Sequence, residues 1–196
     1  GGSASYNLIS GAGTDTLKGD AGDDAFTIAA AGEGNNDTFD GDGGNDTLQL
    51  STGTHTLTDN SKVVNIETIL AHASGSTVDL TNQTEALTIT GAAAVDNLTG
   101  GSGADAITGA AGNDIMSGGA GNDTITGGAN NDIITGGAGN DTFNVDQGTD
   151  TILDLGANND ILVVSSGATA NATNISSFTA TSGTSNAGTA VLTADS

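Results

Sequence analysis

Cysteine, proline and tryptophan are absent from this 196-residue chain, and aromatic residues make up only 3% of it. The lack of cysteine excludes disulfide bonds as the means of holding a fold together. The shortage of large side chains leaves little material for an ordinary globular core. No apolar run approaches the length of a transmembrane helix, so we expect no membrane insertion. Stability must therefore come from another source.

Positive charge is almost as scarce, because 24 acidic residues stand against two lysines, Lys18 and Lys62, and no arginine. The formal net charge of −22 opposes compaction, and composition alone would suit a solvated acidic linker. With so few cations to meet phosphates, we expect no nucleic-acid partner. The first residues, GGSASYNLIS, lack an initiator Met and the pattern of a secretory signal, so we expect a fragment or a processed chain.

Glycine, by contrast, is abundant, with 32 residues, and much of it belongs to a strict repeat. Residues 100–144 contain five consecutive nine-residue units: GGSGADAIT, GAAGNDIMS, GGAGNDTIT, GGANNDIIT and GGAGNDTFN. The sixth position of each unit is aspartate and the eighth is apolar. A short fixed period predicts a solenoid that stacks one structural unit on itself, and this register argues against a disordered linker.

The nine-residue frame also holds in residues 91–99 and 145–153, and it breaks where Asp160 falls one residue late. The aspartates of this main array are Asp96, Asp105, Asp114, Asp123, Asp132, Asp141 and Asp150. Ala92 and Ala94 replace glycines around Asp96, and the turn before Asp150 keeps only the glycine at position four, Gly148. Asn130 replaces a turn glycine, and asparagine is the substitute that best tolerates positive φ.

A second, shorter array lies near the N-terminus, in two pairs of aspartates nine residues apart: Asp15 with Asp24, and Asp37 with Asp46. Corresponding members of the two pairs are 22 residues apart. This spacing equals an eighteen-residue repeat plus a four-residue insertion in residues 27–34. We therefore expect both series of aspartates to continue across the insertion.

Each unit is expected to form a six-residue turn followed by a three-residue strand, because glycine permits tight turns and threonine, valine and isoleucine favour strands. The eighth positions should form the interior, and they are Leu98, Ile107, Met116, Ile125, Ile134, Phe143 and Ile152. Two units should make one coil, so that residues eighteen apart stack. One ladder is then Asp96, Asp114, Asp132 and Asp150, and the other is Asp105, Asp123 and Asp141.

Stacked carboxylates one strand spacing apart, about 4.8 Å, repel one another unless a cation lies between them. Calcium suits such a gap, because it accepts about 6–8 oxygen ligands with tolerant geometry, whereas magnesium is stricter. Zinc would need histidine or cysteine in the turns, and none is there. We therefore predict several Ca²⁺ ions bound by the eleven aspartates of the two arrays. Further ligands would be the backbone carbonyls of Gly100, Gly109, Gly112, Gly118, Gly119, Gly121, Gly127, Gly136 and Gly139.

The units at residues 118–126 and 136–144 resemble the GGxGxD nonapeptide of the RTX (repeats-in-toxin) family. The resemblance is closest over residues 91–153 and extends less closely to residues 10–49. It implies an all-β fold, a right-handed parallel β-roll (a β-solenoid) with calcium bound between stacked turns. It also implies export from Gram-negative bacteria by a type I secretion apparatus, with folding outside the cell.

Four regions are expected along the chain. Residues 1–50 would form an N-terminal calcium β-roll with the four-residue insertion, and residues 51–90 a calcium-free β-solenoid or β insert. Residues 91–163 would form the main RTX calcium β-roll. Residues 164–196 would be an Ala/Ser/Thr-rich tail that serves as a cap, an interface or an export-signal region.

Catalytic signatures are missing, since there is no HExxH, no GxSxG and no cysteine nucleophile. We interpret His55 and His72 as isolated surface or packing residues, and Glu67 and Glu85 as parts of solvated faces. The sequence therefore predicts that this chain is not an enzyme. RTX rolls accompany toxins, proteases, lipases, adhesins and surface-layer proteins, so the fold alone does not decide function.

We expect a calcium-binding extracellular structural protein that folds and self-assembles on calcium binding. It would be a subunit of a surface layer or filament at the bacterial cell surface, and therefore a homo-oligomer. The stretches NIETI, STVDL and LTITG resemble segments of bacterial surface-layer and adhesin proteins that carry RTX repeats. The alternative is a C-terminal calcium-binding and secretion module of a larger RTX exoenzyme or toxin.

A third function, an ice- or ligand-binding adhesin roll, is suggested by outward threonines at Thr124, Thr126, Thr135 and Thr142. The sequence ranks it lowest, because Ala106, Ile115 and Ile133 would interrupt the threonine face.

Overall fold

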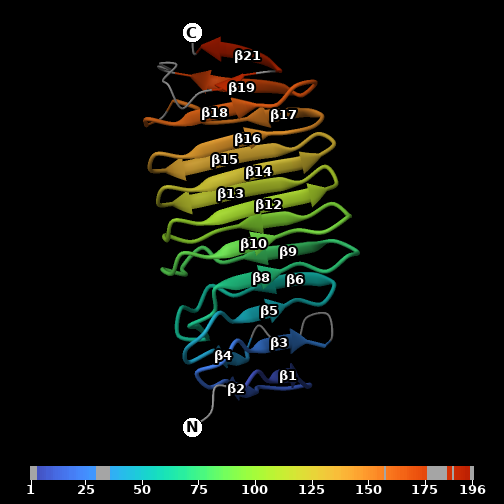
Figure 1. The fold of residues 1–196 in the computed structure, drawn as a ribbon, viewed down its shortest axis with the longest axis vertical. Helices are drawn as coiled ribbons and strands as arrows, with labels where there is room; N and C mark the ends of the chain where they lie inside the picture. Colours follow the sequence, from blue (N-terminus) through green and yellow to red (C-terminus); the bar gives the residue numbers. More distant parts are fainter. Residues whose placement is uncertain (1–3, 30–35, 157, 176–184, 187, 195–196) are drawn as a thin grey trace.

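The computed structural model of the chain is an elongated parallel β-solenoid (Figure 1). It describes residues 4–29, 36–156, 158–175, 185–186 and 188–194, and every regular element among them is a β-strand. The first strand and the last lie at opposite ends of the long axis. Within this described part, no helix has the length and hydrophobicity needed to cross a bilayer.

Two long parallel sheets form the opposite walls of the solenoid, and a short third sheet continues one wall at the N-terminal end. The ten-stranded sheet contains, in order, β1 (Asn7–Ser10), β3 (Ala25–Ile28), β5 (Thr47–Gln49), β8 (Thr68–Leu70), β10 (Thr88–Thr90), β12 (Ala106–Ala111), β14 (Thr124–Ala129), β16 (Thr142–Val145), β18 (Ile161–Val164) and β20 (Ser185–Asn186). The eight-stranded sheet contains β6 (Gly53–Thr56), β9 (Ser76–Asp79), β11 (Asn97–Thr99), β13 (Ile115–Ala120), β15 (Ile133–Ala138), β17 (Thr149–Ile152), β19 (Thr169–Ile175) and β21 (Thr189–Ala194). The three-stranded sheet contains β2 (Thr16–Lys18), β4 (Thr38–Asp40) and β7 (Val63–Val64).

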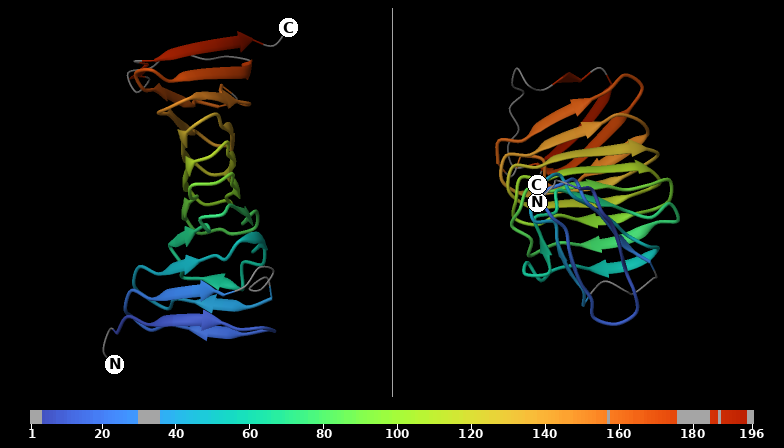
Figure 2. Two further views of the ribbon diagram at one scale, coloured as in Figure 1. Left: turned by 90° about the vertical axis from the view of Figure 1, so that its right-hand side faces the viewer. Right: turned by 60° about the horizontal axis from the view of Figure 1, so that its bottom comes forward.

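Successive coils wind from one wall to the other, and the stack of coils twists about its long axis (Figure 2). The strands of residues 51–90 lie in the same sheets as those of the two repeat arrays, with β8 and β10 in the ten-stranded wall and β6 and β9 in the eight-stranded wall. All these strands pair in parallel, so the expected parallel β-solenoid is confirmed.

The strand register confirms the eighteen-residue coil. Ala106 of β12 pairs with Thr124 of β14 on one wall, and Ile115 of β13 pairs with Ile133 of β15 on the other. In the N-terminal array Ala25 of β3 pairs with residue 47 of β5, which is the predicted spacing of 22. Residues 30–34 of the expected insertion lie outside the described residues, but the register on either side of them is the predicted one.

The interior is a single column of apolar side chains between the two walls. All seven predicted eighth-position residues are at most 1% exposed, which confirms the inward face of the strands. Near the N-terminus the column is widened by Phe26 and Phe39, whose rings meet edge to face with centroids 6.0 Å apart. Each side chain in the column packs against residues one coil above and one coil below, so the few large residues are sufficient.

The strands of the main array are longer than the three residues predicted. The four strands β12–β15 each have six residues, because they run on into the first three positions of the next unit. The backbone kinks at the second position of that next unit, where φ is positive, for example 101° at Gly128 and 108° at Gly119. The strands still pair across the kink, since Ala110 pairs with Gly128. Pairing survives because neighbouring coils bend at the same place.

Two non-glycine residues of the main array adopt the left-handed backbone conformation that the kinks and turns require. Asn130 has φ of 86°, as predicted for the substitute of a turn glycine. Ala110 has φ of 78° at a second position where most units have glycine. Alanine in this region is strained by about 1 kcal/mol relative to glycine.

The expectation of one threonine face interrupted by isoleucines is wrong. Thr124, Thr126 and Thr142 point outward from the ten-stranded wall. Thr135 lies on the eight-stranded wall, and so do the two isoleucines, Ile115 and Ile133. Consecutive nine-residue units alternate between the walls, so residues nine apart in sequence belong to opposite faces.

Candidate metal centre

The sixth-position aspartates of the main array form two ladders, one at each edge of the solenoid. In each rung, Oδ1 of one aspartate accepts a hydrogen bond from the backbone N–H of the aspartate one coil earlier. The distances are 2.8 Å from Asp96 to Asp114, 2.8 Å from Asp114 to Asp132 and 3.1 Å from Asp132 to Asp150. On the other edge they are 2.8 Å from Asp105 to Asp123 and 2.9 Å from Asp123 to Asp141.

The N-terminal array continues the same arrangement in spite of its insertion. The N–H of Asp15 donates to Oδ1 of Asp37 at 2.8 Å, and the N–H of Asp24 donates to Oδ1 of Asp46 at 2.7 Å. Both links join residues 22 apart, so the extra residues are accommodated between the rungs. The predicted continuity of the two ladders is therefore confirmed.

Two further carboxylates belong to the ladders and were missed in the sequence. Oδ1 of Asp160 accepts the N–H of Asp141 at 2.9 Å, so the one-residue slip is absorbed and the ladder continues past residue 153. Oε2 of Glu67 accepts the N–H of Asp46 at 2.7 Å, so Glu67 is a rung and not merely part of a solvated face. The spacings of 19 and 21 residues, which are one and three longer than the eighteen-residue coil, were the available signal.

The second carboxylate oxygen divides the ladder aspartates other than Asp141 into two classes. In Asp15, Asp24, Asp96, Asp105 and Asp160 it accepts an N–H from the residue four positions earlier, at 2.8–3.0 Å. In six others Oδ2 is buried and has no hydrogen-bond partner among the residues that the structure describes, and these are Asp37, Asp46, Asp114, Asp123, Asp132 and Asp150. A buried, unpartnered carboxylate oxygen is strongly unfavourable, and a bound cation would satisfy it.

Glycine at the first position of the units that begin at residues 91 to 136 opens the space that these oxygens face. A methyl group added at Gly109 would lie 2.5 Å from Oδ2 of Asp114 and 2.5 Å from the carbonyl oxygen of Gly127 on the next coil. The same added group at Gly118 would clash with Oδ2 of Asp123 and lie 2.7 Å from the carbonyl oxygen of Gly136. At each of these glycines a carboxylate oxygen and a backbone carbonyl oxygen therefore face the same small space, which we call a cradle.

Of the predicted carbonyl ligands, those of Gly109, Gly118, Gly127 and Gly136 lie at these cradles. The nearest atoms of the cradles do not include the carbonyls of Gly100, Gly112, Gly119, Gly121 and Gly139. At positions two and four of the repeat the carbonyl groups point away from the cradles, for example toward the glycine at the same position on the next coil.

The donor set fits calcium. No three His, Cys, Asp or Glu side chains come together as a metal cluster in the described residues, so each cradle combines one or two carboxylates with backbone oxygens. Oxygen-only ligands in a glycine-lined space are what a hard cation of flexible geometry binds. Zinc or copper would require imidazole or thiolate ligands.

Burial raises the pKa of the central ladder carboxyls. It raises the pKa of Asp114 and Asp123 to about 6 and that of Asp150 to about 7, and negative charges on stacked neighbours add to the effect. Burial likewise raises the pKa of Asp132 and Asp141. In each case the hydrogen bond from the preceding rung acts in the opposite direction. The ladders are therefore sites where negative charge is costly without a counterion.

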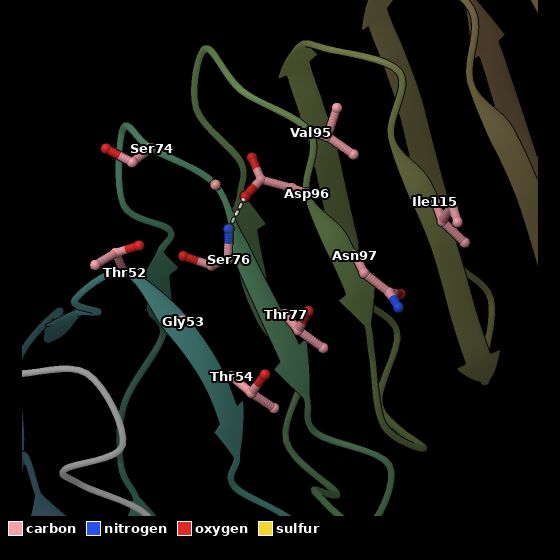
Figure 3. A pocket seen from close by; sticks show the side chains of 11 residues that line it. Thr52, Gly53, Thr54, Ser74, Ser76, Thr77, Val95, Asp96, Asn97 and Ile115 are labelled. Carbon is pink, nitrogen blue, oxygen red and sulfur yellow. Dashed lines mark hydrogen bonds between the residues drawn. The ribbon is translucent and has the colours of Figure 1, made fainter.

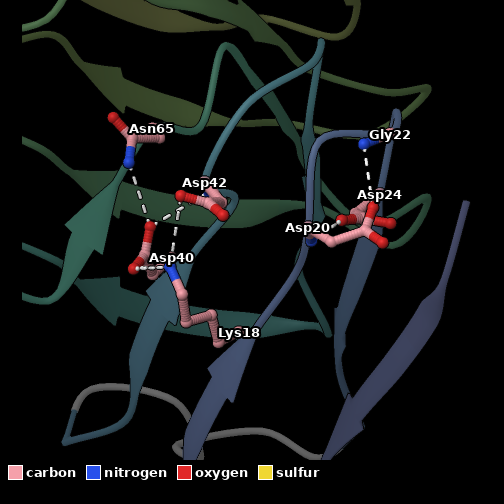
Figure 4. Close-up of polar contacts among 7 residues, drawn as sticks. All are labelled: Lys18, Asp20, Gly22, Asp24, Asp40, Asp42 and Asn65. Atoms are coloured by element: carbon pink, nitrogen blue, oxygen red, sulfur yellow. Dashed lines mark hydrogen bonds and ion pairs between the residues drawn. The ribbon is translucent and has the colours of Figure 1, made fainter. Parts of the chain in front are cut away.

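One lysine supplies a partial counterion outside the main array. Nζ of Lys18, on β2, lies 2.6 Å from Oδ2 of Asp40 and 3.5 Å from Oδ1 of Asp42, and Nδ2 of Asn65 donates to Asp40 (Figure 4). The nearby Asp20 instead caps its own turn by accepting the N–H of Gly22. The Lys18 side chain is 52% exposed, so this ion pair adds little stability.

The two histidines differ in their surroundings. His55 is fully buried in the core, with Nε2 2.9 Å from the carbonyl oxygen of Ser51, and burial lowers its pKa. His72 lies in a turn, where its Nδ1 accepts the N–H of Ser74 at 3.1 Å. His55 therefore packs in the core, one of the two roles expected for it.

A shallow opening of about 330 Å³ lies beside β6, β9 and β11 (Figure 3). Its lining includes hydroxyl-bearing side chains, such as Thr54 and Thr77, next to the exposed Val95. Asp96 faces it, but Oδ1 of Asp96 is held by the N–H of Ser76 at 2.6 Å and Oδ2 by that of Ala92. The opening therefore offers no free carboxylate.

Parallel coils linked by carboxylate ladders, with oxygen-lined cradles at glycine, define a metal-binding β-solenoid. Residues 7–27, 31–53, 90–125 and 117–152 match the model of the RTX calcium-binding nonapeptide repeat, in four copies. These matches cover more than half of the chain, which therefore belongs to the RTX calcium-binding nonapeptide repeat family. No curated protein and no solved structure matches the chain significantly.

Proposed function

We propose that this RTX protein is an extracellular structural protein, without catalytic activity, that folds on calcium binding and then self-assembles into a surface layer or filament. The observation that carries the calcium-dependent step is the set of six buried Oδ2 atoms without a partner. They are stacked along ladders in a chain with a net charge of −22 and only two lysines.

The chain's own residues prepare each site for the ion. The N–H of the preceding aspartate holds Oδ1, which orients Oδ2 toward the cradle. The first-position glycine keeps the cradle open, and the carbonyl of the next coil supplies a second oxygen. Calcium, when bound there, would neutralise the stacked carboxylates and join adjacent coils. Binding free energy would therefore be folding free energy.

Calcium dependence would also suit folding after export. Calcium sites of extracellular modules commonly have dissociation constants of about 10⁻⁴–10⁻³ M. Such sites would stay empty in a low-calcium cytosol and fill outside. The unfolded chain would then be the form carried by a type I secretion apparatus, and the bacterial surface would be the place of folding.

Self-assembly is supported by the distribution of charge. The ladder carboxylates lie at the turns, whereas the outward residues of the ten-stranded wall are uncharged over six successive rungs. These are Thr47, Thr68, Thr88, Ala106, Thr124 and Thr142 in one column, and Gln49, Leu70, Thr90, Thr108, Thr126 and Asn144 in the next. The opposite wall exposes Ile115 by 46% and Ile133 by 42%. Such faces can pack together without burying charge.

The test is to add calcium to the metal-free chain while recording far-UV circular dichroism, and then to examine the product by electron microscopy. We expect a change from coil to β structure, followed by ordered sheets or filaments, with magnesium as the control cation. An equal response to magnesium, or no response, would contradict calcium-dependent folding. Folded chains that remain monomeric would instead favour the alternative, a calcium-binding module of a larger secreted RTX enzyme or toxin.

The regular threonine columns support a second candidate, binding of a periodic uncharged surface such as ice. The calcium-loaded protein would then inhibit ice recrystallisation. Thr108→Asp, in the middle of the columns, should abolish the effect, whereas Thr135→Asp on the other wall should not. Equal behaviour of the two variants would refute this candidate.

A further inference from the structure

A second series of hydrogen bonds runs beside each aspartate ladder, at the fifth position of the repeat. The N–H of Asn131 donates to Oδ1 of Asn113 at 3.1 Å, and the N–H of Thr149 donates to Oδ1 of Asn131 at 2.8 Å. At the other edge of the solenoid, the N–H of Asn140 donates to Oδ1 of Asn122 at 2.8 Å. We call these two series the asparagine ladders.

The same contact occurs at two irregular places in the stack. The N–H of Asn159 donates to Oδ1 of Asn140 at 3.2 Å, across the one-residue slip. In the N-terminal array the N–H of Asn45 donates to Oδ1 of Asp23 at 2.9 Å, across the insertion. The contact therefore forms at spacings of 18, 19 and 22 residues, and a carboxylate oxygen can replace the amide oxygen as its acceptor.

The two kinds of ladder hold successive N–H groups in opposite directions. The N–H of Asn131 donates to the preceding coil, whereas the N–H of Asp132 donates to the following coil, to Oδ1 of Asp150 at 3.1 Å. Two adjacent backbone groups are thereby fixed between three coils. Because a side chain leaves the backbone in a direction that the backbone sets, this double anchoring orients the Asp132 carboxylate, whose Oδ2 is buried without a partner in the described residues.

The asparagine ladders stabilise this arrangement without using a calcium ligand. Their side chains are exposed and neutral, whereas the aspartates beside them are buried. A bond from an N–H to a neutral amide oxygen forms in the absence of the ion, so it can align adjacent coils while the stacked carboxylates still repel one another. Rigid sites bind calcium more tightly, since less order has to be imposed when the ion enters.

Some ladder aspartates lack this support. Residue 104 is alanine, so its side chain offers no oxygen to the N–H of Asn122 one coil later. Asn122 precedes Asp123, and Oδ2 of Asp123, like that of Asp132, is buried without a partner in the described residues. The chain therefore contains open aspartates with the asparagine contact and open aspartates without it.

We propose that the fifth-position asparagines are positioning residues, which raise the calcium affinity of the ladder aspartate one coil later. This inference rests on the proposed calcium-binding function and names the side chains that tune it. The residues concerned in the main array are Asn113, Asn122, Asn131 and Asn140. One neutral hydrogen bond corresponds to a change of about 2- to 10-fold in affinity.

The first test is a calorimetric calcium titration of the wild-type chain, Asn131→Leu and Asn97→Leu. Leucine is similar to asparagine in size and lacks the acceptor oxygen. Asn97 is an exposed asparagine that follows a ladder aspartate instead of preceding one, so it is the control. We expect Asn131→Leu to weaken one site by about 2- to 10-fold and Asn97→Leu to have no effect. Asn131→Asp should bind at least as tightly as the wild type, because a carboxylate accepts the same bond at Asp23.

Terbium luminescence separates positioning from a general loss of stability. Tb³⁺ occupies oxygen-lined calcium sites, and its decay rates in H₂O and D₂O count the water molecules bound to the ion. A poorly oriented carboxylate leaves a ligand place to water, so Asn131→Leu should raise the mean number of bound waters and Asn131→Asp should not. Weaker calcium binding with an unchanged water count would show that Asn131 supports only the fold, which would overturn the inference.

A gain of affinity provides a test that does not depend on a weakened chain. Ala104→Asn would supply the missing acceptor for the N–H of Asn122, and residue 104 is exposed, so a larger side chain fits there. We expect Ala104→Asn to strengthen calcium binding by about 2- to 10-fold, whereas Ala104→Leu should not. Equal titrations of these two variants would overturn this inference alone. A wild-type chain that binds no calcium would overturn the proposed function itself.

Discussion

At the scale of single residues, each ladder aspartate uses its two oxygens differently. Oδ1 of Asp123 accepts the N–H of Asp105, which links adjacent coils directly. Oδ2 of Asp123 is buried without a partner and faces the cradle at Gly118. Oδ2 of Asp105 instead accepts the N–H of Gly101 at 2.9 Å. Identical positions in the repeat therefore differ in what they offer a metal ion.

Replacement of Asp123 should consequently reduce calcium binding more than replacement of Asp105. Asp123→Asn keeps the link to the earlier coil through its amide oxygen, but it removes a charge shared by the coils on either side. We expect more calcium ions to be lost per chain in Asp123→Asn than in Asp105→Asn, as counted by calorimetric titration. Equal losses in the two variants would contradict the distinction between open and closed oxygens.

Ala110 is a strained residue whose replacement should stabilise the fold. Its φ of 78° favours glycine, so Ala110→Gly should raise the free energy of unfolding by up to about 1 kcal/mol, measured by urea denaturation in calcium. Its neighbour Ala111 is in the same strand without positive φ, so Ala111→Gly is the control and should lower stability by roughly 0.5–1 kcal/mol. Destabilisation by both substitutions would show that the strain is absent.

At the scale of elements, each ladder behaves as a set of coupled carboxyls whose charge depends on pH. In the metal-free roll, burial raises the pKa of Asp114 and Asp123 to about 6 and of Asp150 to about 7, above their ordinary value of 3.8. The folded state then binds more protons than the unfolded chain. This contribution to stability is therefore fully present below the ordinary pKa and is lost as pH rises through about 6–7.

Low pH should accordingly stabilise the metal-free fold in part, as calcium does. In metal-free buffer we expect more β structure at about pH 5 than at about pH 8, measured by far-UV circular dichroism. Asp150→Asn should reduce the difference, because it removes the carboxyl with the most strongly raised pKa. Higher stability at the alkaline end would reverse the predicted sign.

The strands contribute through the interior column, and inward and outward positions should differ sharply. Ile125 is fully buried on β14, so Ile125→Ala should cost about 2–5 kcal/mol in urea denaturation with calcium present. Ile133 on β15 is 42% exposed, and Ile133→Ala should cost about 1 kcal/mol or less. Similar costs at the two positions would contradict the assignment of faces.

At the scale of the whole molecule, two opposing factors decide whether the chain folds. Repulsion from the net charge of −22 opposes folding, and burial of a thin apolar column favours it. Without calcium at neutral pH the repulsion should prevail, and the chain should have a radius of gyration of about 47 Å, as for an unfolded chain of this length. Calcium should reduce this radius markedly, measured by small-angle X-ray scattering, whereas magnesium at equal ionic strength should not. A compact metal-free chain would contradict the dependence of the fold on the ion.

Much of this architecture could be predicted from the sequence, because a short period is a local property that survives stacking. The nine-residue spacing predicted the eighteen-residue coil, the inward face and both ladders. The spacing of 22 between Asp15 and Asp37 predicted that the ladders would continue across an insertion. Asn130 could be assigned positive φ because backbone sterics depend on the residue itself.

The tertiary structure alone decided how coils meet one another. Which Oδ2 atoms lack a partner depends on whether an N–H four residues earlier turns inward, and the repeat does not encode that. Glu67 and Asp160 joined the ladders because small slips in spacing are absorbed where adjacent coils align. The convergence of Asp132 and Asp150 at Gly127 likewise required two coils to be in place. Period and composition thus determined a carboxylate-rich solenoid suited to calcium, whereas side-chain contacts between coils, which arise only on stacking, decided where its free oxygens lie.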